Sequence, residues 1–186
     1  MNFEILDFPW SHGYSEAFVD DEFAKKMNKE FPKWDSPIWD KWGKVFDTEY
    51  GYKKMLTDKF IMSVMTPTIR SFIEQLESPE FISTVSEATG IDDLFIDEGL
   101  YGGGLNIYPV GSHLTTHIDF NYNNDLQAYR SVNLLYYMNK DATIDSGGCF
   151  ELYDTNLQKH KSVPSKLNTC IFFATNNKTY HGVNEV

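Results

Sequence analysis

The chain has 186 residues, with 16 basic and 27 acidic side chains and a formal net charge of −11. This length fits one domain that can bury roughly 70% of the surface exposed by the unfolded chain, and the acidic balance disfavours nucleic acid as a partner. No apolar run approaches the ~20 residues that cross a bilayer. The opening MNFEILDFPW has neither the basic start nor the apolar segment of a secretory signal. We therefore expect a cytoplasmic protein with no membrane segment.

Helices are expected in the first half of the chain. From Asp20 to Phe31, apolar residues recur at every fourth position, as on one side of a surface helix. Residues 68–76 also have apolar positions at helical spacing. A third helix has clear ends, because Ser78 can cap it, a proline follows at its first position, and Gly90 can close it.

Between the first two helices, residues 34–52 are rich in aromatic side chains. Such a stretch can form a lid or a wall over a substrate, as functional loops often do. Aromatic clusters more often pack into a core, so both interpretations stay open. The aromatic residues are Trp34, Trp39, Trp42, Phe46, Tyr50 and Tyr52.

After residue 90 the pattern changes to short β-type runs separated by glycine, asparagine and aspartate. This arrangement is typical of an antiparallel sandwich or barrel. We expect a single domain over residues 1–186, in which residues 1–97 form a mainly helical support and possible lid and residues 98–186 form the β core. The runs are FIDEGLY, GLNIYPV, HLTTHIDF, RSVNLLYYMN, GGCFELYD and NTCIFFAT.

The run HLTTHIDF begins at His113 and carries two histidines and an aspartate. Because successive side chains of a strand point to opposite faces, His113, His117 and Asp119 are expected on one face. Ile118 and Phe120 fall on the other face. One face is therefore suited to chemistry and the other to packing.

A metal site on this strand needs a third ligand from elsewhere in the chain. His181 follows the apolar run CIFFAT, several strand lengths after Asp119. Two histidines and one carboxylate on one face of a metal are typical of non-haem Fe(II) oxygenases, whose remaining positions take a bidentate cosubstrate and dioxygen. The spacing alone also fits ordinary structural histidines, so the metal site is one of two interpretations.

Two zinc-based alternatives are weaker. His113 and His117 have the spacing of half a zinc-protease helix motif, but Leu114 stands where that motif needs a glutamate, and β-branched neighbours favour a strand. A zinc hydrolase on His117, Asp119 and His181 would need a general base, and the sequence offers no convincing one. His113 is better interpreted as a polar neighbour in the same cleft or an exposed residue at the strand start.

Five segments extend the pattern beyond the three candidate ligands. In their order and separations they resemble the 2-oxoglutarate and Fe(II)-dependent oxygenases, most closely the prolyl 4-hydroxylase-like branch, over roughly residues 98–186. The resemblance implies a mainly β fold with N-terminal helices, in which the core is a double-stranded β-helix of the jelly-roll or cupin-like type. The segments are YPVGSHLTTHIDF, YRSVNLLYYMNKD, SGGCFELYD, SVPSKLNTCIFFAT and YHGVNEV.

The resemblance also implies roles for particular residues. His117, Asp119 and His181 would be the catalytic residues that bind Fe(II). Tyr108 and Tyr137 stand where relatives use tyrosines to hydrogen-bond 2-oxoglutarate. The alternative for either tyrosine is a core aromatic residue whose hydroxyl is satisfied within the protein.

The reaction implied by the resemblance is a hydroxylation. It converts 2-oxoglutarate, a small-molecule cosubstrate, to succinate and carbon dioxide, with ascorbate as reductant. The prime substrate is a peptide or a small molecule, and peptidyl proline is the first candidate by analogy alone. The alternative is a non-catalytic or degenerate β-helix protein that binds a metal or ligand without turnover.

The charge of the implied site raises one further expectation. Fe(II), one aspartate and the 2-oxoglutarate dianion leave one negative charge unpaired, which is costly in a partly desolvated site. Relatives supply a cation on a strand after the second histidine, whereas this sequence ends at Val186, shortly after His181. We expect a truncated sequence that lacks its last core strand, with Arg130 as an internal alternative for binding the cosubstrate.

Overall fold

The computed structural model describes residues 1–48, 51–56 and 64–186 of the chain. Within these ranges every helix is too short or too polar to cross a bilayer. The helices are α1 (Asp21–Glu30), α2 (Pro37–Trp42), α4 (Pro67–Leu76) and α5 (Pro79–Thr89), with a 3₁₀ turn η1 (Ile144–Ser146). The strands of the first half are β1 (Glu4–Leu6), β2 (His12–Ser15), β3 (Lys44–Thr48) and β4 (Gly51–Leu56). Those of the second half are β5 (Leu105–Ile107), β6 (Leu114–His117), β7 (Tyr122–Asn123), β8 (Ala128–Tyr129), β9 (Val132–Tyr136), β10 (Phe150–Tyr153), β11 (Lys159–Val163), β12 (Cys170–Ala174) and β13 (His181–Val183).

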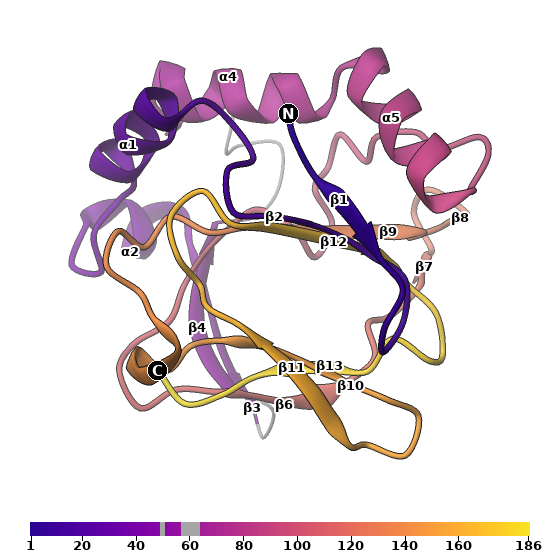
Figure 1. Cartoon of the computed structure of the whole chain (residues 1–186). Coiled ribbons are helices and arrows are strands. Elements are labelled where there is room, and N and C mark those ends of the chain that lie inside the picture. Colours follow the sequence, from indigo (N-terminus) through magenta and orange to yellow (C-terminus); the bar gives the residue numbers. More distant parts are fainter. Residues whose placement is uncertain (49–50, 57–63) are drawn as a thin grey trace.

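Most of the strands build two sheets. The smaller sheet has the order β1-β2-β12-β9, and the larger has the order β11-β10-β13-β6-β4-β3, with β5 paired to β4. Figure 1 shows the two sheets facing each other, with α1, α4 and α5 above the outer side of the smaller sheet. A separate hairpin joins β7 and β8. Strands far apart in the sequence are therefore neighbours, as in a jelly roll.

The hydrophobic side chains form two clusters, one on each side of the smaller sheet. Strand β12 separates them because its residues alternate between its two faces. The cluster between the sheets contains Trp10, Phe150, Leu152, Val163, Ile171 and Phe173. The cluster beneath the helices contains Phe18, Met27, Trp39, Leu56, Met65, Ile69, Phe72, Leu105 and Cys170. The first cluster packs against the candidate site described below.

The three helices predicted from the sequence are present, with ends within one residue of the prediction. Asp20 caps α1 by accepting hydrogen bonds from the backbone of Glu22 and Phe23. Ser78 caps α5 by accepting from the backbone of Phe81. Gly90 ends α5 with a φ of +68°, a left-handed conformation that favours glycine. Local capping chemistry therefore suffices to define these helices.

The prediction for the first 97 residues missed their strands. Strands β1 to β4 lie there beside the helices and belong to both sheets. β2 pairs with β12, and β4 pairs with β5 and β6, which are distant in sequence. These strands are only 3 to 6 residues long, which is too short for periodicity to reveal, and their partners stabilise them.

Two details of the β core also differ from the prediction. FIDEGLY forms no strand, because the Asp97 carboxylate accepts hydrogen bonds from the backbone of Gly99 and Tyr101 and holds a turn. Strand β11, which contains His160, is not among the predicted runs. It pairs with β10, and the polar sequence LQKHK does not indicate this pairing.

The aromatic stretch 34–52 is at least partly a packing element. Trp39 is buried in the cluster beneath the helices, while Trp42 is 44% exposed. Tyr50 lies outside the described residues. A role of this stretch as a lid or substrate wall stays a prediction.

Candidate metal centre

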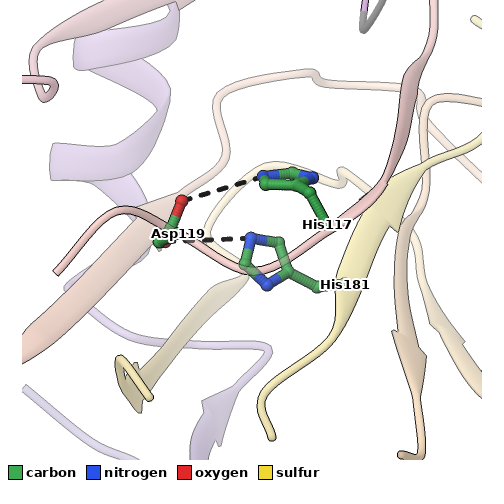
Figure 2. A group of neighbouring side chains, drawn as sticks. All are labelled: His117, Asp119 and His181. Atoms are coloured by element: carbon green, nitrogen blue, oxygen red, sulfur yellow. Dashed lines mark ion pairs between the residues drawn. The ribbon is translucent and has the colours of Figure 1, made fainter. Parts of the chain in front are cut away.

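Strands β6 and β13 bring the two distant histidines together. In the antiparallel pairing of these strands His181 lies opposite His117, and their ring centroids are 4.4 Å apart. Asp119 follows two residues after the end of β6 and turns its carboxylate toward both rings (Figure 2). One ligand atom from each of the three residues lies within 4.8 Å of the others, so the group could hold a metal ion.

The two histidines are oriented by the backbone. His117 Nδ1 lies 2.8 Å from the carbonyl oxygen of Thr115, and His181 Nδ1 lies 2.9 Å from that of Thr179. Because a carbonyl oxygen can only accept, the neutral form of each ring carries its proton on Nδ1 and keeps a free lone pair on Nε2. Both Nε2 atoms face Asp119, at 3.7 and 3.8 Å from its carboxylate oxygens. This is the orientation that metal-binding histidines require.

The carboxylate of Asp119 is held by two further side chains. Asn133 donates a hydrogen bond of 2.8 Å to Oδ2, and the guanidinium of Arg130 lies 3.8 Å from Oδ1. Burial raises the pKa of Asp119, but His117, Arg130 and the other contacts outweigh it and hold this pKa at about 2. Asp119 is therefore ionised at neutral pH and available as an anionic ligand.

His181 lies at the buried side of the group and is 4% exposed. Its ring stacks on the ring of Phe150, with 5.2 Å between the centroids, and contacts the ring of Phe173, with 4.9 Å between the centroids. Burial lowers the pKa of His181 to about 4, although Asp119 opposes the shift. The imidazole is therefore neutral near pH 7, as a metal ligand must be.

His113 does not join the group. It is exposed and lies just before β6. The strand conformation of β6 also excludes the helical histidine pair considered for a zinc protease. His113 is therefore an exposed residue at the start of the strand and not a polar neighbour within the metal site.

The two tyrosines predicted to bind the cosubstrate lie near each other. Burial raises the pKa of Tyr108 to about 12. Burial also raises the pKa of Tyr137 far above its ordinary value, and the nearby Tyr108 adds to the shift. Tyr137 packs against the cluster between the sheets. Both hydroxyls therefore stay neutral, and their predicted contacts with 2-oxoglutarate remain predictions.

Two polar residues beside the group were not predicted from the sequence. One is Asn133, which binds Asp119 from β9. The other is Lys53 on β4, whose ammonium lies 5.6 Å from the centroid of the Tyr108 ring. Burial lowers the pKa of Lys53 to about 8, Asp119 opposes the shift, and Arg130 adds to it. Lysines occur at two adjacent positions in GYKKML, and only the long-range pairing of β4 shows which one faces the site.

Comparisons with known proteins agree with this geometry. Residues 103–186 match the family model described as the 2OG-Fe(II) oxygenase superfamily. No curated protein matches the chain.

Two solved structures resemble the whole chain. One is a prolyl-4-hydroxylase from Pseudomonas putida, with a TM-score of 0.66 and 12% identity, over 94% of this chain and 85% of that chain. The other is a prolyl hydroxylase from Trichoplax adhaerens in complex with a hypoxia inducible factor oxygen degradation domain peptide fragment. It has a TM-score of 0.64 and 14% identity, over 94% of this chain and 77% of that chain. The predicted double-stranded β-helix fold is thereby confirmed.

Members of the matched superfamily are enzymes whose cofactors are Fe(II) and 2-oxoglutarate. The match to residues 103–186 contains all three side chains of the candidate metal group. Residues 103–186 of the chain therefore resemble the 2OG-Fe(II) oxygenase superfamily, and the chain shares its fold with the two prolyl hydroxylases.

Proposed function

We propose that the protein is an Fe(II)- and 2-oxoglutarate-dependent hydroxylase in which His117, Asp119 and His181 bind the iron. The observation that carries this proposal is the geometry of the group. Its ligand atoms lie within 4.8 Å of one another, and both Nε2 atoms face the carboxylate. Two imidazoles and one carboxylate fit Fe(II), and they leave positions for a bidentate cosubstrate and dioxygen.

When bound, iron and 2-oxoglutarate supply the oxidising chemistry: dioxygen places one oxygen atom in a C–H bond of the substrate and one in succinate, with release of carbon dioxide. The protein's own residues bind and orient. Asn133 and Arg130 hold the carboxylate of Asp119 in position. Phe150 and Phe173 cover His181 and exclude water from the buried side. Tyr108 and Tyr137 would donate hydrogen bonds to the cosubstrate.

A peptide containing proline is the first substrate to test. Two contacting pairs of exposed aromatic rings, Tyr101 with Phe120 and Tyr122 with Tyr129, are here called the aromatic rim. The Arg130 guanidinium lies 4.9 Å from the centroid of the Phe120 ring. Such rings offer apolar faces on which an extended proline-containing segment can pack. The Trichoplax hydroxylase is itself bound to a peptide, which supports this choice.

The experiment is a turnover assay under air with Fe(II), 2-oxoglutarate and ascorbate, with and without a proline-containing peptide. We expect succinate by NMR and a peptide product heavier by one oxygen atom. His117→Ala should abolish both products, whereas His113→Ala, outside the metal group, should retain them. Metal binding without succinate under any of these conditions would instead support the non-catalytic alternative.

A further inference from the structure

Strand β4 presents two neighbouring lysines in opposite directions. Side chains of a strand alternate between its faces, so Lys53 and Lys54 cannot share an environment. Lys54 donates a hydrogen bond of 3.2 Å to the carbonyl oxygen of Trp34 and lies 4.3 Å from the centroid of that ring. Lys53 instead faces the ring of Tyr108. Tyr108 directly follows Ile107, the last residue of β5, and Ile107 pairs with Lys54 of β4.

The ammonium of Lys53 belongs to the surroundings of the metal group. Asp119 and Arg130 are the charged residues that influence its pKa, and burial is the largest influence. A pKa of about 8 leaves the ammonium mostly protonated at pH 7. Lys53 is thus a partly desolvated cation on the side of the site where Tyr108 lies.

Metal binding changes the charge balance around this cation. In the metal-free arrangement the single negative charge of Asp119 offsets one of the two positive charges of Lys53 and Arg130. Once that carboxylate binds a divalent metal, two cations lie beside a metal whose own charge is only half neutralised. An excess of positive charge in a desolvated site favours an anionic ligand. The dianion 2-oxoglutarate is such a ligand.

Lys53 is better placed than Arg130 to bind this ligand. Arg130 contacts Asp119 at 3.8 Å and stacks on Phe120, which is 46% exposed. It therefore lies toward the aromatic rim. Lys53 lies toward the two buried tyrosines, since its ammonium faces Tyr108 and Tyr108 in turn lies close to Tyr137.

We propose that Lys53 binds a carboxylate group of 2-oxoglutarate and supplies the cation that the site needs. A lysine from β4 would do so in addition to, or in place of, any cation that follows His181. This inference rests on the proposed function. The ammonium can bind either the distal carboxylate of the cosubstrate or the carboxylate beside its keto group, because both are anionic hydrogen-bond acceptors.

The test is an equilibrium titration without oxygen, so that no turnover occurs. The Fe(II)-loaded protein is titrated with 2-oxoglutarate, and the visible charge-transfer absorption of the bound 2-oxo acid gives its dissociation constant. A second titration uses 2-oxopentanoate, which has the same chain length and lacks the distal carboxylate. The variants are Lys53→Met, Lys53→Arg and the matched control Lys54→Met.

Lys53→Met should weaken 2-oxoglutarate binding by about tenfold or more, as expected for loss of a hydrogen bond between charged groups. Lys53→Arg should stay within about threefold of the wild type, because it keeps the charge, and Lys54→Met should leave binding unchanged. If Lys53 meets the distal carboxylate, Lys53→Met will not affect 2-oxopentanoate. If it meets the other carboxylate, both ligands will weaken equally.

Wild-type affinity of Lys53→Met for both ligands would overturn this inference while leaving the proposed function intact. A wild-type protein that binds Fe(II) but develops no absorption with 2-oxoglutarate would overturn the proposed function itself. Lys53→Gln replaces the methionine variant if that variant does not fold, with the same expected loss of affinity.

Discussion

At the scale of single residues, Asp119 is the candidate ligand whose orientation depends most on contacts with other side chains. The imidazoles of His117 and His181 are oriented by backbone carbonyl groups, which side-chain substitutions do not remove. Asp119 lies beyond the end of β6, and Asn133 and Arg130 hold it through side-chain contacts. Substitution of these partners should therefore affect metal binding without removing a ligand.

Asn133→Ala should weaken Fe(II) binding by about tenfold or more, because the carboxylate of Asp119 loses its 2.8 Å hydrogen bond. The measurement is an anaerobic Fe(II) titration of the purified variant. Asn124→Ala is the matched control, since Asn124 is an exposed asparagine in the turn between β7 and β8. Equal Fe(II) affinities of the two variants would show that Asn133 does not position the ligand.

At the scale of elements, helix α5 shows how local capping supports the layer above the smaller sheet (Figure 1). Ser78 accepts a hydrogen bond from the backbone of Phe81 at the start of the helix. Val85 is its buried residue. The stability of α5 therefore depends on its cap as well as on packing.

Ser78→Ala should lower the free energy of unfolding by about 1 kcal/mol, the usual effect of losing a capping side chain. Chemical denaturation measures this difference. Ser83→Ala, at an exposed position inside the same helix, should change stability little or raise it slightly, because alanine favours helix. Equal losses in both variants would contradict a specific role of the cap.

Strand β2 contains a second buried histidine, His12, which lies opposite Phe173 of β12 and is 2% exposed. Its Nδ1 lies 2.8 Å from the carbonyl oxygen of Trp10, while its buried Nε2 has no hydrogen-bond partner among the described residues. Burial lowers the pKa of His12 below 6.5, and Lys161 adds to the shift, although the Trp10 carbonyl and Asp7 oppose it. The folded protein therefore keeps this imidazole neutral.

Stability should fall as the pH drops below about 6.5, because the unfolded chain then binds a proton at His12 that the folded chain binds only at lower pH. His12→Asn should remove this contribution, since asparagine does not titrate. The measurement is the free energy of unfolding of both proteins between pH 7.5 and 5 (roughly the interval in which histidines titrate). The same pH dependence of the unfolding free energy in the wild type and in His12→Asn would show that His12 does not cause the loss of stability.

At the scale of the whole molecule, the metal group depends on contacts between distant parts of the chain. The caps Ser78 and Gly90 could be predicted because each acts on residues a few positions away. His117 and Asp119 could also be recognised as a pair of candidate ligands, since both lie in the short run HLTTHIDF. His181 could be raised as a candidate third ligand from its place in the sequence and was assigned through the family resemblance. Its pairing opposite His117 was not predicted, because it depends on the long-range pairing of β13 with β6.

Other features could not be predicted because their causes are not local. Strands β1 to β4 are too short to show periodicity, and β2 and β4 pair with strands from the second half of the chain. Lys53 and Asn133 reach the site only through this pairing. The prediction of a strand in FIDEGLY was wrong for a local reason. The carboxylate of Asp97 stabilises a turn within a pattern that resembles a strand.

The most direct test of the central claim is the stoichiometry of Fe(II) binding in an anaerobic titration. We predict one Fe(II) per chain for the wild type and for His113→Ala, and loss of this binding in His117→Ala, Asp119→Ala and His181→Ala, because each removes one of three ligands. Circular dichroism must show that these variants remain folded. Wild-type Fe(II) affinity in any folded variant of the three would contradict the assignment of the metal centre.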